Sequence, residues 1–258
     1  MDDVIKVTEV AAEFIRSHAG KVTVEDIETK SRNSLVSFVD KNAEKILVEG
    51  LGRIIPGAGF ITEEGTVEQK PAEYTWVIDP LDGTTNYLHH IPVYSISIGL
   101  LHEEQIILGV VCDIVHRETF YAWKGGGAWL NGHQIHVSNR TDISDALIAT
   151  GFPYAKKDVL PQLTLIFDFF LKHARGMRRL GSAAIDLAYV ACGRFDAYYE
   201  TSLNPWDIAA GVLIVEEAGG VVTDFAGEKE MLQNGRVIAA TPSLYQTVAR
   251  NIMSLFQA

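Results

Sequence analysis

The chain has 258 residues, of which 47% are hydrophobic and 21% charged, so it can bury a large core as one extended unit. Its net charge of −11 argues against nucleic acid as the main ligand, because the protein would repel phosphate backbones. That charge does not exclude a small phosphate ester if metal ions screen the site. The acidic N-terminus is not typical of a signal peptide, and no apolar run approaches the length of a membrane span. We therefore expect a cytoplasmic protein with no membrane association, in which the two distant cysteines, Cys112 and Cys192, are buried thiols.

The first half of the chain predicts two helices followed by a sheet. Apolar residues at helical spacing predict an amphipathic helix over 3–18 and a second one that begins at Asp40 and ends before Pro56. The polar residues 21–35 between them predict a solvated loop. Runs rich in β-branched residues then predict strands over 93–101, 106–115 and 118–123, and Asn131-Gly132 predicts a hairpin. This order indicates a mostly antiparallel sheet.

The second half predicts alternating helices and strands. Helical spacing predicts helices over 160–173, from Ser182 as N-cap to Cys192, and from Pro205 to Ala218, with a closing helix from Ser243. Strands are predicted over 196–200, 221–224 and 237–240. Neither an internal repeat nor a linker-like stretch interrupts the chain. We therefore expect one unit over 1–258, with an N-terminal half of about 1–140 and an α/β C-terminal half of about 141–258.

The stretch from Trp76 to Asn86 contains the strongest functional signal. An apolar run predicts the end of a buried strand, which continues directly into Asp79 and Asp82 at a turn. Two carboxylates held close together raise each other's pKa unless a cation lies between them. Mg²⁺, which prefers oxygen ligands, is a suitable cation. The alternative for an isolated D-x-x-D-G pattern is a polar strand-to-helix turn with an Asp cap, and the pattern alone does not decide between the two.

Three further features accompany these two carboxylates. Gly83 and Thr84 follow Asp82 at a predicted helix start, where free backbone N–H groups bind phosphate. Glu63 and Glu64 lie in a Gly turn, where exposed acid pairs are also common. Asp207 lies in the first turn of a predicted helix, where a carboxylate is favoured by the helix dipole whether or not it has another function.

The full string Asp79-Pro-Leu-Asp-Gly-Thr-Thr-Asn86 resembles the first signature of the inositol monophosphatase family, D-P-[IL]-D-G-T-T-N. The segment from Trp206 to Gly211 resembles the second signature, W-D-x-A-[AG]-G. The Glu63-Glu64 pair resembles the family's G-E-E segment, with Thr62 in place of the usual Gly. The resemblance extends over nearly the whole chain. It implies a layered αβαβα sandwich of the inositol monophosphatase and fructose-1,6-bisphosphatase type, a homodimer, and a Mg²⁺-dependent, lithium-sensitive phosphatase.

The resemblance also implies a set of metal ligands. Glu63 and Asp79 would hold one Mg²⁺ together with the carbonyl of Leu81, while Asp79, Asp82 and Asp207 would hold a second. We expect about two or three ions per site, in which metal-activated water attacks the phosphate.

Carried over in the same way, the remaining site residues act on water and substrate. Glu64 would support metal-bound water, and Thr84 would orient the attacking water together with Glu63. The residues that would contact the substrate are Gly83, Thr84, Ser182, Ala183, Glu200 and Asp207. Lys30 would lie near the mouth of the site.

Several functions remain open at this level. The form Gly83-Thr-Thr-Asn86 is similar to the inositol monophosphatase branch, so inositol monophosphate is the expected substrate. Fructose 1,6-bisphosphate, a nucleotide bisphosphate and histidinol phosphate are the alternatives within the family. Certain bacterial members act with RNA polymerase as antitermination factors, so a protein partner is a further alternative that does not require catalysis.

Overall fold

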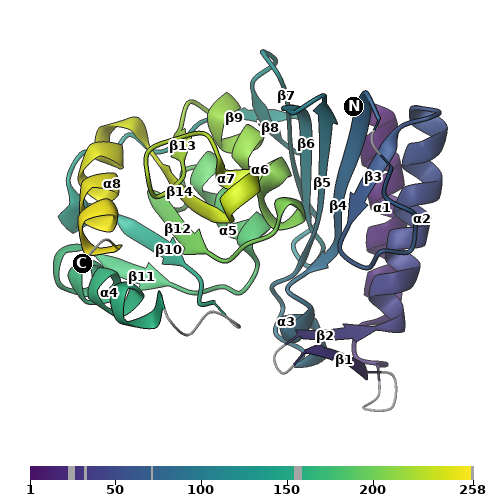
Figure 1. The fold of residues 1–258 in the computed structure, drawn as a ribbon, viewed down its shortest axis with the longest axis horizontal. Coiled ribbons are helices and arrows are strands. Elements are labelled where there is room, and N and C mark those ends of the chain that lie inside the picture. The colour runs from purple at the N-terminus through teal and green to yellow at the C-terminus, as the bar shows by residue number, and fades with distance from the viewer. Residues whose placement is uncertain (23–26, 32–33, 71, 154–158, 257–258) are drawn as a thin grey trace.

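The computed structural model describes all residues except 23–26, 32–33, 71, 154–158 and 257–258, and it describes only the backbone of 27–31 and 34–37. Five layers follow one another across the molecule in the order helices, sheet, helices, sheet, helices (Figure 1). The predicted αβαβα sandwich is therefore confirmed.

The first layer consists of α1 (Asp2–His18) and α2 (Phe38–Ile54), which pack against each other and cover one face of the larger sheet (Figure 1). Ile15, Leu47 and Leu51 are fully buried with Trp76 of the sheet. Burying large apolar side chains of this kind stabilises each by about 1.5–3 kcal/mol. Both predicted helices are confirmed, and α2 begins two residues earlier than expected.

The larger sheet has seven strands in the order β3-β4-β5-β6-β7-β8-β9. Their bounds are Gly59–Thr62, Tyr74–Asp82, Ser95–His102, Gln105–Asp113, Glu118–Trp123, Ala128–Leu130 and His133–Ile135. Neighbouring strands are antiparallel except β3 and β4, which are parallel. The prediction of a mostly antiparallel sheet is confirmed.

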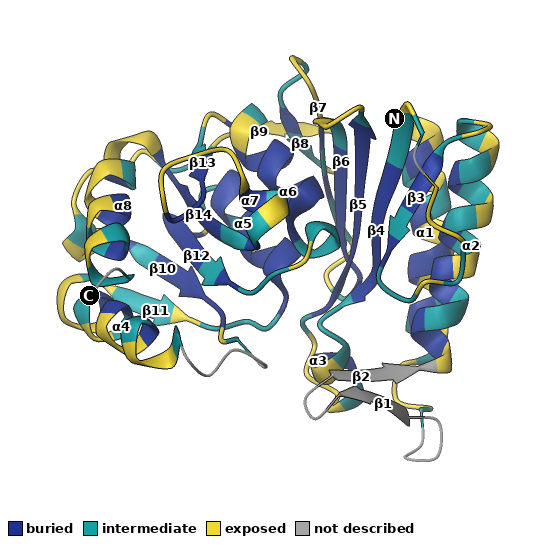
Figure 2. Cartoon of the chain, viewed as in Figure 1, coloured by how far each residue is buried: buried dark blue, intermediate teal, exposed yellow. Residues whose placement is uncertain are grey.

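The middle layer of helices is covered by a sheet on each side, which explains why the helix over Pro205–Glu217 is apolar on nearly all sides. α5 (Ala183–Ala191), α6 (Pro205–Glu217) and the short α7 (Met231–Asn234) lie between the two sheets, and the residues of α5 and α6 are mostly buried there (Figure 2). A Cβ at Gly109 would approach the carbonyl oxygen of Ala210 to 2.6 Å, so this glycine lets α6 pack closely on the sheet.

The smaller sheet has five strands in the order β11-β10-β12-β14-β13. In that order their bounds are Gly176–Arg178, Leu147–Thr150, Ala197–Thr201, Arg236–Ala240 and Val221–Thr223. β10 is parallel to both of its neighbours, whereas β14 is antiparallel to its own. A 3-10 turn, η2 (Ile143–Asp145), precedes β10, and α4 (Leu160–His173) and α8 (Pro242–Phe256) cover the outer face.

Four sequence predictions were wrong or incomplete. The expected solvated loop over 21–35 contains an antiparallel pair, β1 (Ile27–Ser31) and β2 (Ser34–Ser37), because strand pairing uses backbone groups that polar residues also have. β4 continues to Asp82 instead of ending before Asp79. β10 and β11 were not predicted. Cys112 and Cys192 are free thiols as expected, but Cys192 is partly exposed. No helix within the described residues is long and apolar enough to cross a membrane.

Candidate active site

The register of two parallel strands brings the first pair of acids together. Thr62 at the end of β3 is the partner of Ile78 in β4, and the next residues on the two strands are Glu63 and Asp79. The backbone N–H of Glu63 donates to the carbonyl of Ile78 at 3.2 Å, which holds the two chains side by side beyond the paired strands. The two carboxyl groups therefore lie at the same edge of the sheet.

Asp79 lies in the most crowded position of the acid cluster. Its side chain is 2% exposed, and its Oδ1 accepts a hydrogen bond from the backbone N–H of Leu81 at 2.9 Å. Burial raises its pKa well above the usual range, and the nearby charges of Glu63, Asp82 and Asp207 raise it further, as does a hydrogen bond with Glu63. Carboxyl groups from both halves of the chain are thus close enough to affect one another.

Asp82 connects the end of β4 to the start of α5. Its Oδ2 accepts hydrogen bonds from the Oγ of Ser182 at 2.6 Å and from the backbone N–H of Ala184 at 2.8 Å. Burial raises the pKa of Asp82 to about 6, although these two hydrogen bonds act in the opposite direction. Pro80 is tolerated in β4 because the pairing with β5 is irregular between Asp79 and Asp82, where no donor is required.

Asp207 caps a helix and also lies close to the other acids of the cluster. It lies in the first turn of α6, where the helix dipole favours a carboxylate as predicted, and its Oδ2 also caps the helix by accepting a hydrogen bond from the backbone N–H of Asn204 at 2.7 Å. Burial raises its pKa, followed by the charge of Asp82 and smaller effects of Glu63 and Glu200. The cap therefore also places this carboxyl beside the acids of the other half.

The acid cluster fits Mg²⁺ by its chemistry, since all four acids provide the oxygen donors that this ion prefers. As they stand, however, no three or more His, Cys, Asp and Glu side chains in the described part of the chain are arranged to hold a metal ion. The charges of Glu63, Asp82 and Asp207 raise the pKa of Asp79, and a cation bound among these acids would favour their charged forms instead.

Gly83 and Thr84 form the start of a short helix, α3 (Thr84–Leu88), at the edge of the cluster. Gly83 has φ +97°, and a Cβ there would lie 3.0 Å from the carbonyl oxygen of Val93, so both conformation and space require glycine. The first N–H groups of a helix have no partner inside it, which makes them available to an anion.

The hydroxyl of Thr84 has a partner that the sequence did not indicate. Its Oγ1 lies 3.0 Å from the Oδ1 of Asp40 and 3.0 Å from the carbonyl oxygen of Leu81, and it can donate to either. Asp40 is 1% exposed and belongs to α2, where it was predicted only as a helix start. In the sequence, the only signal was an acid at the beginning of a predicted helix, which is equally typical of a simple cap.

Glu200 belongs to the C-terminal half, at the end of β12. It forms a second wall of the site, and Glu63, Asp79 and Asp82 of the N-terminal half form the first. Its Oε2 accepts a hydrogen bond from the hydroxyl of Tyr198 at 2.5 Å, and a Cβ built on Gly151 would lie 2.0 Å from its carboxylate. Burial raises the pKa of Glu200 to about 7. Tyr198 and Gly151 thus hold this carboxylate in place, and neither had been singled out from the sequence.

Asp186 is a further acid that sequence reasoning missed. It is 1% exposed on α5, and its Oδ1 has no hydrogen-bond partner within the described residues. Burial raises its pKa well above the usual range, and Glu200 and Asp82 add to this, while Arg179 opposes it. The acidic character of the site therefore extends beneath the wall that contains Glu200.

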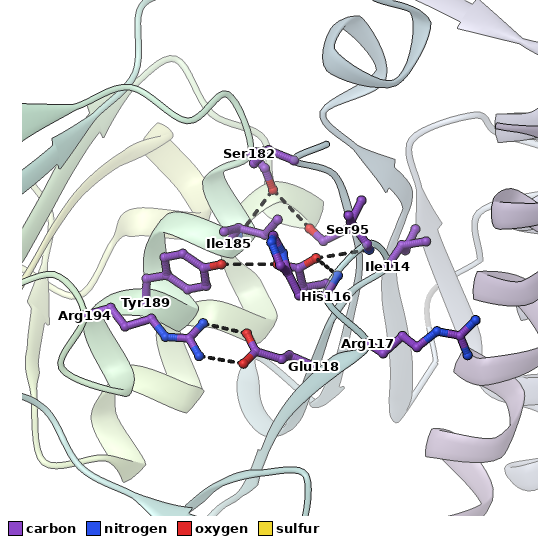
Figure 3. Close-up of polar contacts among 12 residues, drawn as sticks. Ser95, Ile114, His116, Arg117, Glu118, Ser182, Ile185, Tyr189 and Arg194 are labelled. Carbon is purple, nitrogen blue, oxygen red and sulfur yellow. Dashed lines mark hydrogen bonds and ion pairs between the residues drawn. The ribbon is translucent and has the colours of Figure 1, made fainter. Parts of the chain in front are cut away.

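Polar contacts join the two halves behind the site. The hydroxyl of Ser182 lies 3.0 Å from that of Ser95 and caps α5 through the N–H of Ile185 (Figure 3). Arg194, just beyond α5, binds the carboxylate of Glu118 through two hydrogen bonds of 2.5 and 2.6 Å. Ser182 is buried and already contacts Asp82, so its hydroxyl supports that acid, and its contact with substrate stays a prediction.

Three other predicted residues complete the account. Ala183 is buried beside Ser182, and Glu64 follows Glu63 in the loop after β3. The side chain of Lys30 lies outside the described residues. The structure thus brings Glu63, Asp79, Asp82 and Asp207 within electrostatic reach of one another.

The chain resembles known proteins over nearly its whole length. The model of the inositol monophosphatase family matches residues 2–256. The chain belongs to this family. It is 39% identical to "Inositol-1-monophosphatase" of Mesorhizobium japonicum, covering 90% of this chain and 88% of that protein. It is 38% identical to "Nus factor SuhB" of Pseudomonas aeruginosa, covering 94% and 91%. The structure of an IMPase from Thermotoga maritima is 31% identical, with a TM-score of 0.90 and coverage of 99% and 97%.

These comparisons confirm the family and the fold. Membership supports phosphatase activity, while the relatives' two different names leave the substrate open.

Proposed function

We propose that the protein is a Mg²⁺-dependent phosphomonoesterase that hydrolyses inositol monophosphate to inositol and phosphate. The observation that supports this most directly is the convergence of four acids from three segments, Glu63, Asp79, Asp82 and Asp207, beside the start of α3. A dianionic substrate could not approach such a cluster without cations, because like charges would repel it.

We assign metal binding to the four acids and to the carbonyl of Leu81. When bound, Mg²⁺ supplies positive charge for the phosphate oxygens and lowers the pKa of water. The hydrogen bonds of Leu81, Ser182 and Asn204 orient the carboxylates of Asp79, Asp82 and Asp207 before any ion arrives. Glu64 is placed at the edge of the same loop, where it would support an ordered water.

Thr84 and Asp40 orient the attacking water in this proposal. A hydroxyl has one proton and two lone pairs, so Thr84 can donate to Asp40 and still accept a hydrogen bond from water. Asp40 fixes the rotation of that hydroxyl, and its buried carboxylate can receive a proton through it. Glu63 would contact the same water in this assignment.

The substrate would lie between the two walls. The N–H groups of Gly83 and Thr84 would bind the phosphate, and Glu200 would accept hydrogen bonds from ring hydroxyls. Ala183, Ser182 and Asp207 would line the space between them. The hydroxyl of Tyr198 holds the carboxylate of Glu200 in one orientation. The hydroxyls of a polyol can donate hydrogen bonds to the remaining lone pairs of this carboxylate.

Phosphate release from four esters tests the proposal: inositol 1-phosphate, fructose 1,6-bisphosphate, 3′-phosphoadenosine 5′-phosphate and histidinol phosphate, each with Mg²⁺ and with EDTA. We expect Mg²⁺-dependent turnover that is fastest on the inositol ester and is inhibited by millimolar Li⁺. Preference for another ester would keep the metal assignment and change the substrate. Full activity in EDTA would contradict the assignment of the acids.

A second candidate function is supported by the relatives named as Nus factors. The protein would then bind a partner associated with RNA polymerase through its surface, as a homodimer, without direct contact to nucleic acid. Purified RNA polymerase retained by the Asp82→Asn variant would support this function. Absence of binding by both the variant and the wild type, together with turnover of an ester, would argue against it.

A further inference from the structure

A buried acid on α2, outside the predicted site, holds the loop that contains Glu63 and Glu64. Glu44 is 0% exposed and lies one helical turn after Asp40. Its Oε2 accepts a hydrogen bond from the backbone N–H of Glu64 at 2.7 Å. Its Oε1 accepts three more, from the backbone N–H of Thr66 at 2.7 Å, the hydroxyl of Thr66 at 2.8 Å and the hydroxyl of Thr62 at 3.0 Å.

All four donors come from the five residues between Thr62 and Thr66. Burying a carboxylate is costly unless hydrogen bonds replace its water, and four donors provide that replacement. The loop is therefore bound to α2 on one side, while the N–H of Glu63 binds β4 on the other. Thr62, which stands where the family usually has Gly, contributes one of these donors through its side chain.

The position of Glu44 on the helix connects it to the reacting groups. Residues four apart lie on the same face of a helix, so Asp40 and Glu44 both point from α2 toward the site. Asp40 contacts Thr84, and Glu44 contacts the loop of Glu63 and Glu64. One helix thus supports both the hydroxyl that orients water and the loop that supplies metal ligands.

We propose that Glu44 is a positioning residue that fixes Glu63 and Glu64 for Mg²⁺ binding. This inference rests on the proposed function, because it assigns Glu63 to the metal. A residue behind the ligands affects metal affinity by holding them in place, and its loss typically weakens binding about 10–100-fold. A purely structural role would instead lower stability and leave the affinity of the folded protein for Mg²⁺ unchanged.

The Glu44→Gln variant separates these two roles. A glutamine amide carries N–H donors on one side, so it must face either the N–H of Glu64 or the three donors at Oε1, and it loses acceptors in both orientations. Glu49→Gln is the matched control, since Glu49 lies on the same helix and its exposed side chain pairs with that of Arg53. Thr66→Val is the milder variant, because it removes one of the four hydrogen bonds and keeps the side-chain shape.

The measurements are the Kd for Mg²⁺ by calorimetry, the Mg²⁺ concentration for half-maximal ester hydrolysis, the substrate KM at saturating Mg²⁺, and Tm in EDTA. We expect Glu44→Gln to raise both Mg²⁺ values by about tenfold and to change the substrate KM less than twofold. We expect Thr66→Val to raise the Mg²⁺ values by about threefold and Glu49→Gln to match the wild type.

Wild-type Mg²⁺ affinity in folded Glu44→Gln would overturn the inference and leave the proposed function intact. If Glu44→Gln does not fold, Thr66→Val decides, and wild-type Mg²⁺ affinity in that variant would overturn the inference. A wild-type protein that binds no Mg²⁺ would overturn the inference and the proposed function together.

Discussion

The two walls of the site are built in different ways. The wall from the N-terminal half consists of Glu63, Asp79 and Asp82, which lie within twenty residues of one another and are fixed largely by strand register. The wall from the C-terminal half contains Glu200, whose carboxylate is fixed by the side chain of Tyr198 and by the absence of a side chain at Gly151. The first wall therefore depends on charge placed by the backbone, whereas the second depends on space and on neighbouring side chains.

Different consequences follow for substitution. On the first wall, a carboxylate can be neutralised without disturbing the packing, so metal binding should fail while the fold survives. On the second wall, a single added methyl group should displace the acid and affect substrate selection without affecting the metal.

Asp82→Asn should lower kcat on the preferred ester by about a thousandfold. Asparagine can still accept the hydrogen bonds of Ser182 and Ala184 through its Oδ1, so the fold should persist. Removing one charge from a crowded acid cluster should leave Tm in EDTA unchanged or raise it. Steady-state kinetics and thermal unfolding of the same preparation check both statements.

Asp168→Asn is the control for this change, because Asp168 is an exposed acid on α4 that pairs with Lys172. It should keep wild-type kcat. Unfolding of Asp82→Asn in metal-free buffer would show that this wall depends on its hydrogen bonds more than on its charge.

Asp40→Asn should lower kcat by about a hundredfold, because the hydroxyl of Thr84 would lose its charged partner. Thr84→Val should have a similar effect, whereas Thr84→Ser, which keeps the hydroxyl, should stay within a few-fold of wild type. Affinity for Mg²⁺, measured by calorimetry, should change little in all three variants. A large loss of Mg²⁺ affinity in Asp40→Asn would place Asp40 among the metal-binding groups instead.

The contrast between the walls also explains what the sequence could predict. Glu63, Asp79, Asp82 and Asp207 were recognisable because each lies in a short motif whose local geometry follows from strand ends and helix starts. The five layers were predictable for the same reason, since apolar periodicity and two signatures cover most of the chain.

The missed residues depend on contacts between distant segments. Gly151 and Glu200 are separated by nearly fifty residues, and the parallel pairing of β10 and β12 brings them together. No local sequence pattern encodes this pairing. Asp40 and Glu44 looked like ordinary polar residues of an amphipathic helix. Their buried positions became apparent only when β3 and α3 were placed against α2.

Gly151→Ala tests the second wall directly. The new Cβ would overlap the carboxylate of Glu200, which must then break its hydrogen bond with Tyr198 or move into the pocket. We expect KM for inositol 1-phosphate to rise about tenfold, as for the loss of one hydroxyl contact. KM for phenyl phosphate, which has no ring hydroxyls, should change less than twofold, and Mg²⁺ affinity should not change.

Gly52→Ala provides the matched control, because Gly52 lies on α2 and a Cβ there meets the side chain of Phe60 on β3 at an ordinary distance of 3.7 Å. It should leave both KM values unchanged. Equal increases of KM for the two esters in Gly151→Ala would contradict a role in substrate selection and would indicate a general distortion of the site.

The smallest predicted effect concerns stability and pH. Burial raises the pKa of Glu200 to about 7 in the folded protein, from an ordinary value of 4.5. Between these two values the folded chain holds a proton that the unfolded chain releases, so stability falls as pH rises through this window and the loss is complete above it. Glu200→Gln removes the ionisation and should raise Tm in EDTA by roughly 3 °C at pH 8, with almost no change at pH 4. The exposed acid Glu9, changed to Gln, should give the same small Tm difference at both pH values. A higher Tm for Glu200→Gln at pH 4 alone would contradict this prediction. It would show that folding lowers the pKa of Glu200, because its surroundings stabilise the carboxylate, and this wall too would then depend on charge.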